Sequence, residues 1–112
     1  MAKLVRLSEH RRSKAKRVSF DRQELRQLLD VYSRRVASGE WKDYAIDMRH
    51  GAAVFSIFRH TFDRPVFAVA KRANGRKCDY LLFSGLEQIK RGQSIGEVLS
   101  TFDRPLRLIS RR

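Results

Sequence analysis

The chain has 112 residues, of which 42% are hydrophobic, so its length and composition are those of one domain with its own core and not of two. Its 25 lysines and arginines outnumber its 12 aspartates and glutamates, and the resulting net charge of +13 attracts polyanions such as DNA and RNA. The single cysteine, Cys78, excludes an internal disulfide and a zinc site built from several cysteines.

The first 19 residues carry seven basic side chains, one acid and few apolar side chains. The basic residues are Lys3, Arg6, Arg11, Arg12, Lys14, Lys16 and Arg17. Because this stretch has so little to bury, it is predicted to be a flexible arm that precedes a single domain at residues 20–112. Such an arm is typical of segments that follow phosphates or enter a minor groove, and the alternative is a solvated tail that aids solubility.

A helix is predicted directly after the arm. Asp21 is a favourable N-cap, and Glu24 three positions later completes a capping box. Gly39 supplies the C-terminal stop. The buried stripe expected at helical spacing consists of Leu25, Leu28, Leu29, Tyr32 and Val36.

After Trp41 the hydrophobic period changes to two residues, which predicts strands at 44–48, 53–59, 66–72 and 77–83 and a weaker strand at 86–90. Ser94 and Glu97 predict a second capping box and a short helix. Its inward residues are expected to be Ile95, Val98, Leu99 and Phe102. A final strand is predicted at 106–109. The predicted fold is therefore α+β: an N-terminal helix, an antiparallel meander of four to five strands, a short helix and a last strand.

The sequence between the third and fourth strands predicts a type I′ hairpin turn centred on Asn74 and Gly75, because both residues tolerate a positive φ. This turn would place Val69 opposite Tyr80, Phe67 opposite Leu82 and Ala68 opposite Leu81. Four basic residues would then gather at the tip, with Asp79 as the only nearby acid: Lys71, Arg72, Arg76 and Lys77. A basic ribbon can straddle a phosphate backbone or enter a groove, whereas the alternative is a solvated tip whose charges resist aggregation.

The predicted strands carry apolar side chains on both faces. Phe55 and Ile57 lie on one face of the second strand, and its other face carries Val54 and Phe58. The first helix is expected on the face with the small side chains of Ala68 and Ala70. The other face then needs a cover, which could be the second helix, a second subunit or stacked bases.

Three stretches of the chain resemble a small alphaproteobacterial family catalogued as domain of unknown function 2794. They are residues 26–41 (RQLLDVYSRRVASGEW), 53–60 (AVFSIFRH) and 102–108 (FDRPLRL). The similarity spans residues 20–109 and leaves out the basic arm. It implies a bacterial, cytoplasmic protein, but it implies no activity and transfers no functional residue.

The sequence does not favour catalysis. The three histidines, His10, His50 and His60, stand in no pattern that implies a neighbouring nucleophile. The chain has no metal-binding motif, no phosphate-cradling loop and no dinucleotide fingerprint, so neither a cofactor nor a metal is expected. No apolar run reaches the roughly 18 residues that cross a bilayer, and the N-terminus has no signal-peptide core, so a cytoplasmic location is expected.

These features predict a non-enzymatic nucleic-acid-binding protein, with DNA favoured over RNA and a nucleoid location if DNA is the ligand. The arm and the hairpin tip would supply the phosphate contacts. The alternative is a protein-interaction or regulatory module that binds an acidic protein. No membrane partner is expected because the arm lacks the bulky apolar face of an interfacial helix, and a homodimer stays open.

Overall fold

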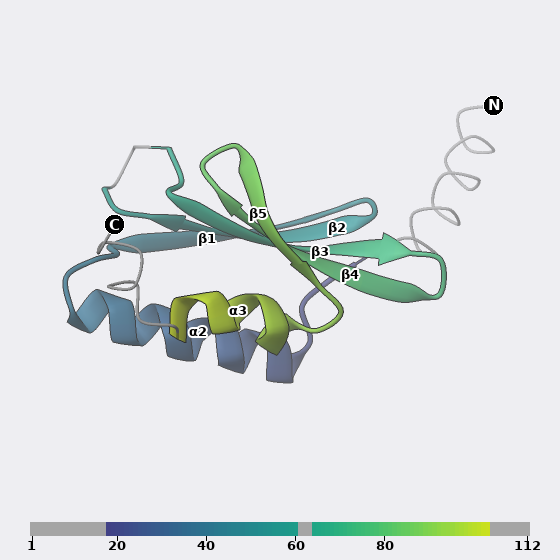
Figure 1. Ribbon diagram of the computed structural model, residues 1–112, viewed down its shortest axis with the longest axis horizontal. Coiled ribbons are helices and arrows are strands. Elements are labelled where there is room, and N and C mark those ends of the chain that lie inside the picture. Colours follow the sequence, from purple (N-terminus) through teal and green to yellow (C-terminus); the bar gives the residue numbers. More distant parts are fainter. Residues whose placement is uncertain (1–17, 61–63, 104–112) are drawn as a thin grey trace, which may run out of the picture.

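One antiparallel sheet forms the centre of the fold, and two helices cover the same face of it (Figure 1). The computed structural model of the chain describes residues 18–60 and 64–103. Its elements are α2 (Arg22–Ala37), β1 (Asp43–Arg49), β2 (Ala52–Phe58), β3 (Phe67–Asn74), β4 (Lys77–Ser84), β5 (Glu87–Gly92) and α3 (Ile95–Asp103). The strands lie in chain order, so the predicted α+β meander is confirmed. The predicted last strand at 106–109 lies outside the described residues.

Helix α2 begins at the predicted capping box. The Asp21 carboxylate accepts from the Glu24 backbone N–H at 2.8 Å, and the Glu24 carboxylate accepts from the Asp21 N–H at 2.9 Å. The helix ends at Ser38, and Gly39 follows with a φ of +83°, a conformation that costs glycine little. Within the predicted stripe Leu28 is fully buried, whereas Val36 near the helix end is 40% exposed.

The helices pack on the sheet face that carries the larger side chains. Phe55 and Ile57 of β2 are buried there with Val69 of β3 and Leu82 of β4. The expectation that α2 would cover the face with Ala68 and Ala70 is wrong, because those residues point to the opposite side. The larger side chains remove more apolar area from water, and this favours the observed choice of face.

The β3–β4 hairpin forms as predicted, but its register differs. Asn74 pairs with Lys77, which makes Gly75 and Arg76 the two central residues of the turn. Gly75 has a φ of +66°, and a positive φ is required at the first central position of such a turn. Each predicted partner is therefore shifted by two residues. The observed pairs are Val69 with Leu82, Phe67 with Ser84 and Ala68 with Phe83. A shift of two keeps every side chain on its face.

Helix α3 buries the four residues predicted to face inward: Ile95, Val98, Leu99 and Phe102. Its first turn is capped by Ser94, whose hydroxyl accepts from the Glu97 N–H at 3.2 Å. Near its end, the Phe102 ring lies edge-on to Trp41 and Phe67, with centroids 5.1 and 5.0 Å away. These contacts join α3 to the sheet and to the segment after α2.

The other side of the sheet, here called the open face, is not covered by any helix or strand of the described ranges (Figure 1). By strand alternation, β2, β3 and β4 contribute to it Val54, Ser56, Phe58, Ala68, Ala70, Leu81 and Phe83. Charged residues lie towards the hairpin end, and β1 adds Asp43 and Asp47. None of these seven belongs to the core cluster or packs against it. The core cluster therefore lies on the helix side, although Ala70 and Leu81 of the open face are also buried, with 8% and 5% exposed.

The two faces should differ in their contribution to stability. Phe55→Ala, within the core, is expected to lower the free energy of unfolding by about 3–5 kcal/mol because it leaves a cavity. Phe83→Ala, on the open face, should cost about 1 kcal/mol because that ring is only half buried. Urea unfolding followed by circular dichroism measures both values. Equal losses would mean that the open face is a second core.

Candidate nucleic-acid interface

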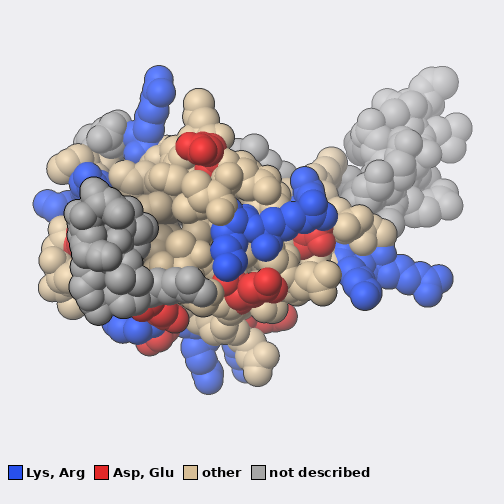
Figure 2. Space-filling model, viewed as in Figure 1, with Lys and Arg blue, Asp and Glu red and all other residues tan. Residues whose placement is uncertain are grey.

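Positively charged side chains gather where β3, β4 and β5 meet the hairpin turn. We call this the basic end of the sheet, and it consists of Arg72, Arg76, Lys77 and Arg91. Arg72 lies on β3 opposite Asp79, and Arg91 lies on β5 opposite Leu81, so both belong to the open side of the sheet. Figure 2 shows basic side chains over β5 and at the far end of the β3–β4 hairpin, with acidic atoms between them.

One buried carboxylate organises half of this group. A single oxygen of Asp79 accepts from the Arg91 guanidinium at 2.8 Å, from the Asn74 amide at 2.9 Å and from Arg72 at 3.5 Å. Desolvation alone would raise the pKa of Asp79, but the hydrogen bond and charge of Arg91, then Asn74 and Arg72, outweigh it and hold the pKa below its usual value.

Asp79 orders the two arginines and leaves most of their donors available. A guanidinium has five N–H donors, and each arginine bonds this carboxylate through one terminal nitrogen. The side chains of Arg72 and Arg91 remain 47% and 57% exposed. The cluster therefore presents two positioned guanidiniums to solvent with one compensating negative charge.

Arg76 and Lys77 complete the basic end at the turn and the first residue of β4. Both are exposed, and within the described ranges neither has an ion-pair partner. The structure therefore brings three of the four predicted hairpin residues together at the surface. Arg91 was missed by sequence reasoning because β5 was predicted only weakly and as ending at residue 90, so that its pairing to β4 beside Asp79 was not foreseen.

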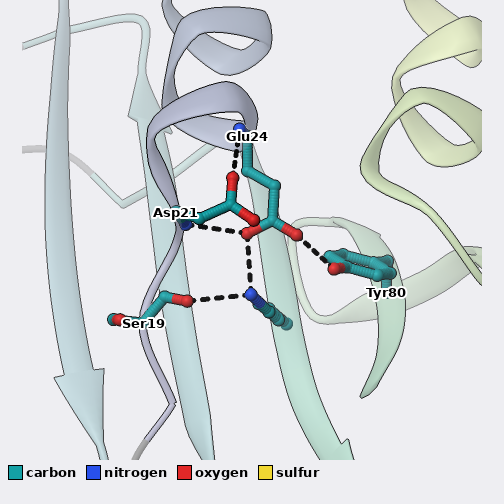
Figure 3. Close-up of polar contacts among 5 residues, drawn as sticks. Ser19, Asp21, Glu24 and Tyr80 are labelled. Atoms are coloured by element: carbon teal, nitrogen blue, oxygen red, sulfur yellow. Dashed lines mark hydrogen bonds and ion pairs between the residues drawn. The ribbon is translucent and has the colours of Figure 1, made fainter. Parts of the chain in front are cut away.

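Lys71 lies elsewhere, on the helix side of the sheet, where it contacts Glu24; Figure 3 shows Glu24 between Asp21 and Tyr80. Its ammonium donates to the Glu24 carboxylate at 2.7 Å and to the Ser19 carbonyl at 2.9 Å, and its side chain is only 13% exposed. The Tyr80 hydroxyl donates to the other oxygen of Glu24. Burial, followed by the hydrogen bond to Glu24, raises the pKa of Tyr80.

The Lys71 ammonium is therefore bound inside the protein. The prediction that Lys71 lies at the hairpin tip is wrong. The shifted register sets Lys71 opposite Tyr80, three residues before the turn begins. Glu24 is a second acid near the hairpin that sequence reasoning treated only as part of a helix cap. We refer below to Glu24, Lys71 and Tyr80 as the Glu24 cluster.

The arm residues predicted to bind phosphate lie outside the described ranges. They are Lys3, Arg6, Arg11, Arg12, Lys14, Lys16 and Arg17. The described part has 14 lysines and arginines and 10 aspartates and glutamates, a net charge of +4 out of the +13 of the whole chain. The last nine residues contain four further basic residues and no acid, a feature that the sequence reasoning did not single out: Arg104, Arg107, Arg111 and Arg112. Most of the excess charge therefore belongs to the two terminal segments.

Other kinds of site find little support in the described ranges. There, no three side chains of histidine, cysteine, aspartate or glutamate come together in a way that could hold a metal ion. Neither described helix is long and apolar enough to span a bilayer. The surface recess beside Asp79 is lined by Arg91, Gly92, Gln93 and Glu97. At the start of α3, beside this recess, the Glu97 carboxylate accepts from the Gln93 N–H at 3.0 Å.

Residues 18–99 match the family described as protein of unknown function DUF2794. The chain belongs to this family. The match covers α2, the whole sheet and the first half of α3, so both the basic end and the Glu24 cluster lie within it. The resemblance found in the sequence is thereby confirmed. No curated protein and no solved structure matches the chain.

Lys71 of this DUF2794 protein should act on stability and not as a surface charge. Lys71→Met leaves the Glu24 carboxylate without its cation, so we expect a loss of about 3 kcal/mol in the free energy of unfolding. Adding Glu24→Gln removes the stranded charge and should recover part of this loss. Arg76→Met is the matched control, with an expected change within about 0.5 kcal/mol. Equal losses for Lys71→Met and Arg76→Met in urea unfolding would contradict the burial of this ion pair.

Asp79 should make the free energy of unfolding depend on pH in the acidic range. Its folded-state pKa lies below the unfolded value of about 3.9, so its contribution is complete above that value and is lost as the pH falls through the folded pKa. The free energy of unfolding of Asp79→Asn should therefore be lower than that of the wild type at pH 7. The difference between the two should become smaller near pH 3. Asp30→Asn, in an exposed pair with Arg34, should change stability little at either pH. A gap that widens on acidification would refute this account.

Proposed function

We propose that this DUF2794 protein binds nucleic acid, with DNA favoured over RNA, and that the basic end of the sheet supplies phosphate contacts. The observation that carries the proposal is the gathering of Arg72, Arg76, Lys77 and Arg91 at one end of the sheet, where the Asp79 carboxylate pairs with Arg72 and Arg91. Phosphates are the polyanions that such a surface meets in a cell, and arginine binds them through two parallel N–H donors. A role inside the cytoplasm, at the nucleoid if the ligand is DNA, belongs to the same proposal.

The order that Asp79 imposes supports a binding surface over a merely charged one. An arginine that is free in solvent must lose side-chain entropy when it is fixed on a ligand. Arg72 and Arg91 are already held by the Asp79 carboxylate, and their remaining donors are exposed. Asp79 is therefore proposed as a positioning residue for the phosphate contacts. The role is binding without catalysis, since the group contains guanidiniums, an ammonium and one ion-paired acid.

The two terminal segments would add affinity without fixing the orientation. Residues 1–17 contain seven basic residues and residues 104–112 contain four. Phosphate contacts release counterions from the nucleic acid, so affinity should fall steeply as the salt concentration rises. If about six phosphates are neutralised, the logarithm of the association constant should fall against the logarithm of salt concentration with a slope near −5 on duplex DNA.

The test is fluorescence anisotropy of the full-length chain with labelled DNA at several salt concentrations. Arg76→Ala with Lys77→Ala should weaken binding and reduce the magnitude of the salt slope by up to about two. Arg22→Ala with Arg26→Ala removes the same charge from exposed positions of α2, in the helix layer, and should change the slope less. Both double variants should unfold at the same urea concentration as the wild type.

Two outcomes would overturn this proposal. The first is the absence of detectable binding near 50 mM salt, where phosphate contacts are strong. The second is equal weakening by the hairpin pair and the α2 pair, which would mean that net charge alone matters. Purification from the native cell adds a separate check: a partner protein that remains after nuclease treatment would point to an acidic protein ligand in place of nucleic acid.

A further inference from the structure

Two aromatic side chains are set apart from all others in the described ranges. Phe58 of β2 and Phe83 of β4 are half-buried, lie outside the core cluster and contact none of the other rings that the structure describes. Every other described aromatic residue lies in the core cluster, packs against it or contacts a ring of the helix side. Both isolated rings project from the open face, which no described helix or strand covers (Figure 1).

The side chains between these two rings are small. Phe83 pairs with Ala68 of β3, which in turn pairs with Ser56 of β2, and Phe58 lies two residues further along β2. The usual spacing of strands and residues puts the two rings about 12 Å apart along a diagonal of the sheet. Ala68 and Ser56 therefore add little bulk above the sheet between the two rings.

The basic end adjoins this pair of rings on the same face. Leu81 pairs with Arg91 and precedes Phe83 by two residues on β4, so a rise of about 7 Å along the strand separates the row of Arg91 from the row of Phe83. Arg72 lies on the next row towards the hairpin. The acids Asp43 and Asp47 of β1 belong to the same face, and Asp43 is the cross-strand partner of Phe58. The basic end therefore lies on the side of Phe83, and the diagonal from Phe83 to Phe58 leads away from it across β3 to β2.

We propose that the open face binds single-stranded nucleic acid. The sugar-phosphate backbone would contact the ordered guanidiniums of Arg72 and Arg91, and two bases would stack on Phe83 and Phe58. This inference rests on the proposed function and adds the class of ligand. Rings that stack bases beside a positively charged path recur in proteins that bind single strands, and sheet platforms of this kind carry two or three such rings. In a duplex the faces of the bases are already stacked on one another, so these rings would contribute nothing.

The charge of the protein argues against a second copy as the occupant. The described part alone carries +4 and the whole chain +13, so two copies facing each other would bring like charges together. A strand of phosphates has the opposite sign. The self-association alternative is tested directly, because the same variants can be examined by analytical ultracentrifugation.

The first experiment compares four labelled probes: a 20-nucleotide single strand of DNA, the RNA strand of the same sequence, and the two corresponding duplexes. Phe58→Leu with Phe83→Leu keeps apolar bulk but removes both rings, so single-strand affinity should fall by about 30-fold or more while duplex affinity stays unchanged. The control is Tyr44→Leu, which removes a half-exposed ring from the helix side of β1 and should leave both affinities unchanged. The DNA and RNA arms show which single strand is preferred.

The outcomes separate the two proposals. If the wild type binds none of the probes, the proposed function itself fails. If the hairpin pair Arg76→Ala with Lys77→Ala weakens binding but the double phenylalanine variant binds single strands like the wild type, the protein binds nucleic acid and the single-strand inference is wrong. A variant that binds normally but converts a dimeric wild type to a monomer would identify the open face as a self-interface and also overturn the inference.

A second experiment uses the unmodified protein, so it does not depend on how a variant folds. Single strands containing 5-iodouracil are irradiated in complex with the wild type, and the crosslinked peptides are mapped by mass spectrometry. Crosslinks to Phe58 or Phe83 are expected, because a stacked base lies in van der Waals contact with the ring. Crosslinks confined to residues 1–17, to residues 104–112 or to the hairpin turn would contradict binding across the face.

Discussion

The placement of the helix layer on the sheet depends on the buried carboxylate of Glu24. One of its oxygens accepts from the Asp21 N–H and from the Lys71 ammonium, and the other accepts from the Tyr80 hydroxyl. A single side chain thereby closes the first turn of α2 and ties it to β3 and β4. Apolar packing holds the layers together but is not directional, whereas these hydrogen bonds fix which part of the helix meets which part of the hairpin. The same cluster includes the Ser19 carbonyl and lies close to the buried Val18 in sequence, so the folded part already includes the residues just after the basic segment.

Two carboxylates near the same hairpin illustrate how burial and surroundings give one residue type two roles. Glu24 lies between layers, and its lysine is almost wholly enclosed with it, so that pair contributes to the fold. Asp79 lies on the open side, and its arginines extend from it into solvent, so their outer donors stay available. Removing Lys71 leaves the Glu24 carboxylate without its cation in the interior, which is costly, whereas Asp79 keeps one arginine partner when the other is removed. The proposed separation of folding residues from binding residues follows from the different exposure of their cations.

The local elements could be read from the sequence because their signals are short-range. The Asp21 and Glu24 cap, the inward residues of α3 and the alternation of β2 all depend on neighbours within a few positions. The relations between elements could not be read in the same way. Both faces of β2 carry aromatic side chains, so periodicity alone does not say which face the helices choose. The hairpin register depends on whether glycine takes the first or the second central position of the turn, and the partners of Lys71 and Asp79 depend on that register. The basic end was therefore predicted only in part, with Lys71 included and Arg91 left out.

Strand β4 contributes to both faces of the sheet, because its side chains alternate between the helix side and the open face. Tyr80 and Leu82 point to the helices, while Asp79, Leu81 and Phe83 point to the open side. Tyr80 and Leu82 belong to the core, so their substitution should destabilise the fold whether or not a ligand is bound. The outward set begins with the acid that pairs with two arginines and ends with Phe83, which lies outside the core cluster and contacts no other ring in the described ranges. An apolar sheet face without a cover has a cost in water, and small residues at its centre reduce the area that water must touch. A large aromatic ring on such a face increases that cost, and the proposed stacking of a base on Phe83 would remove part of the ring from water.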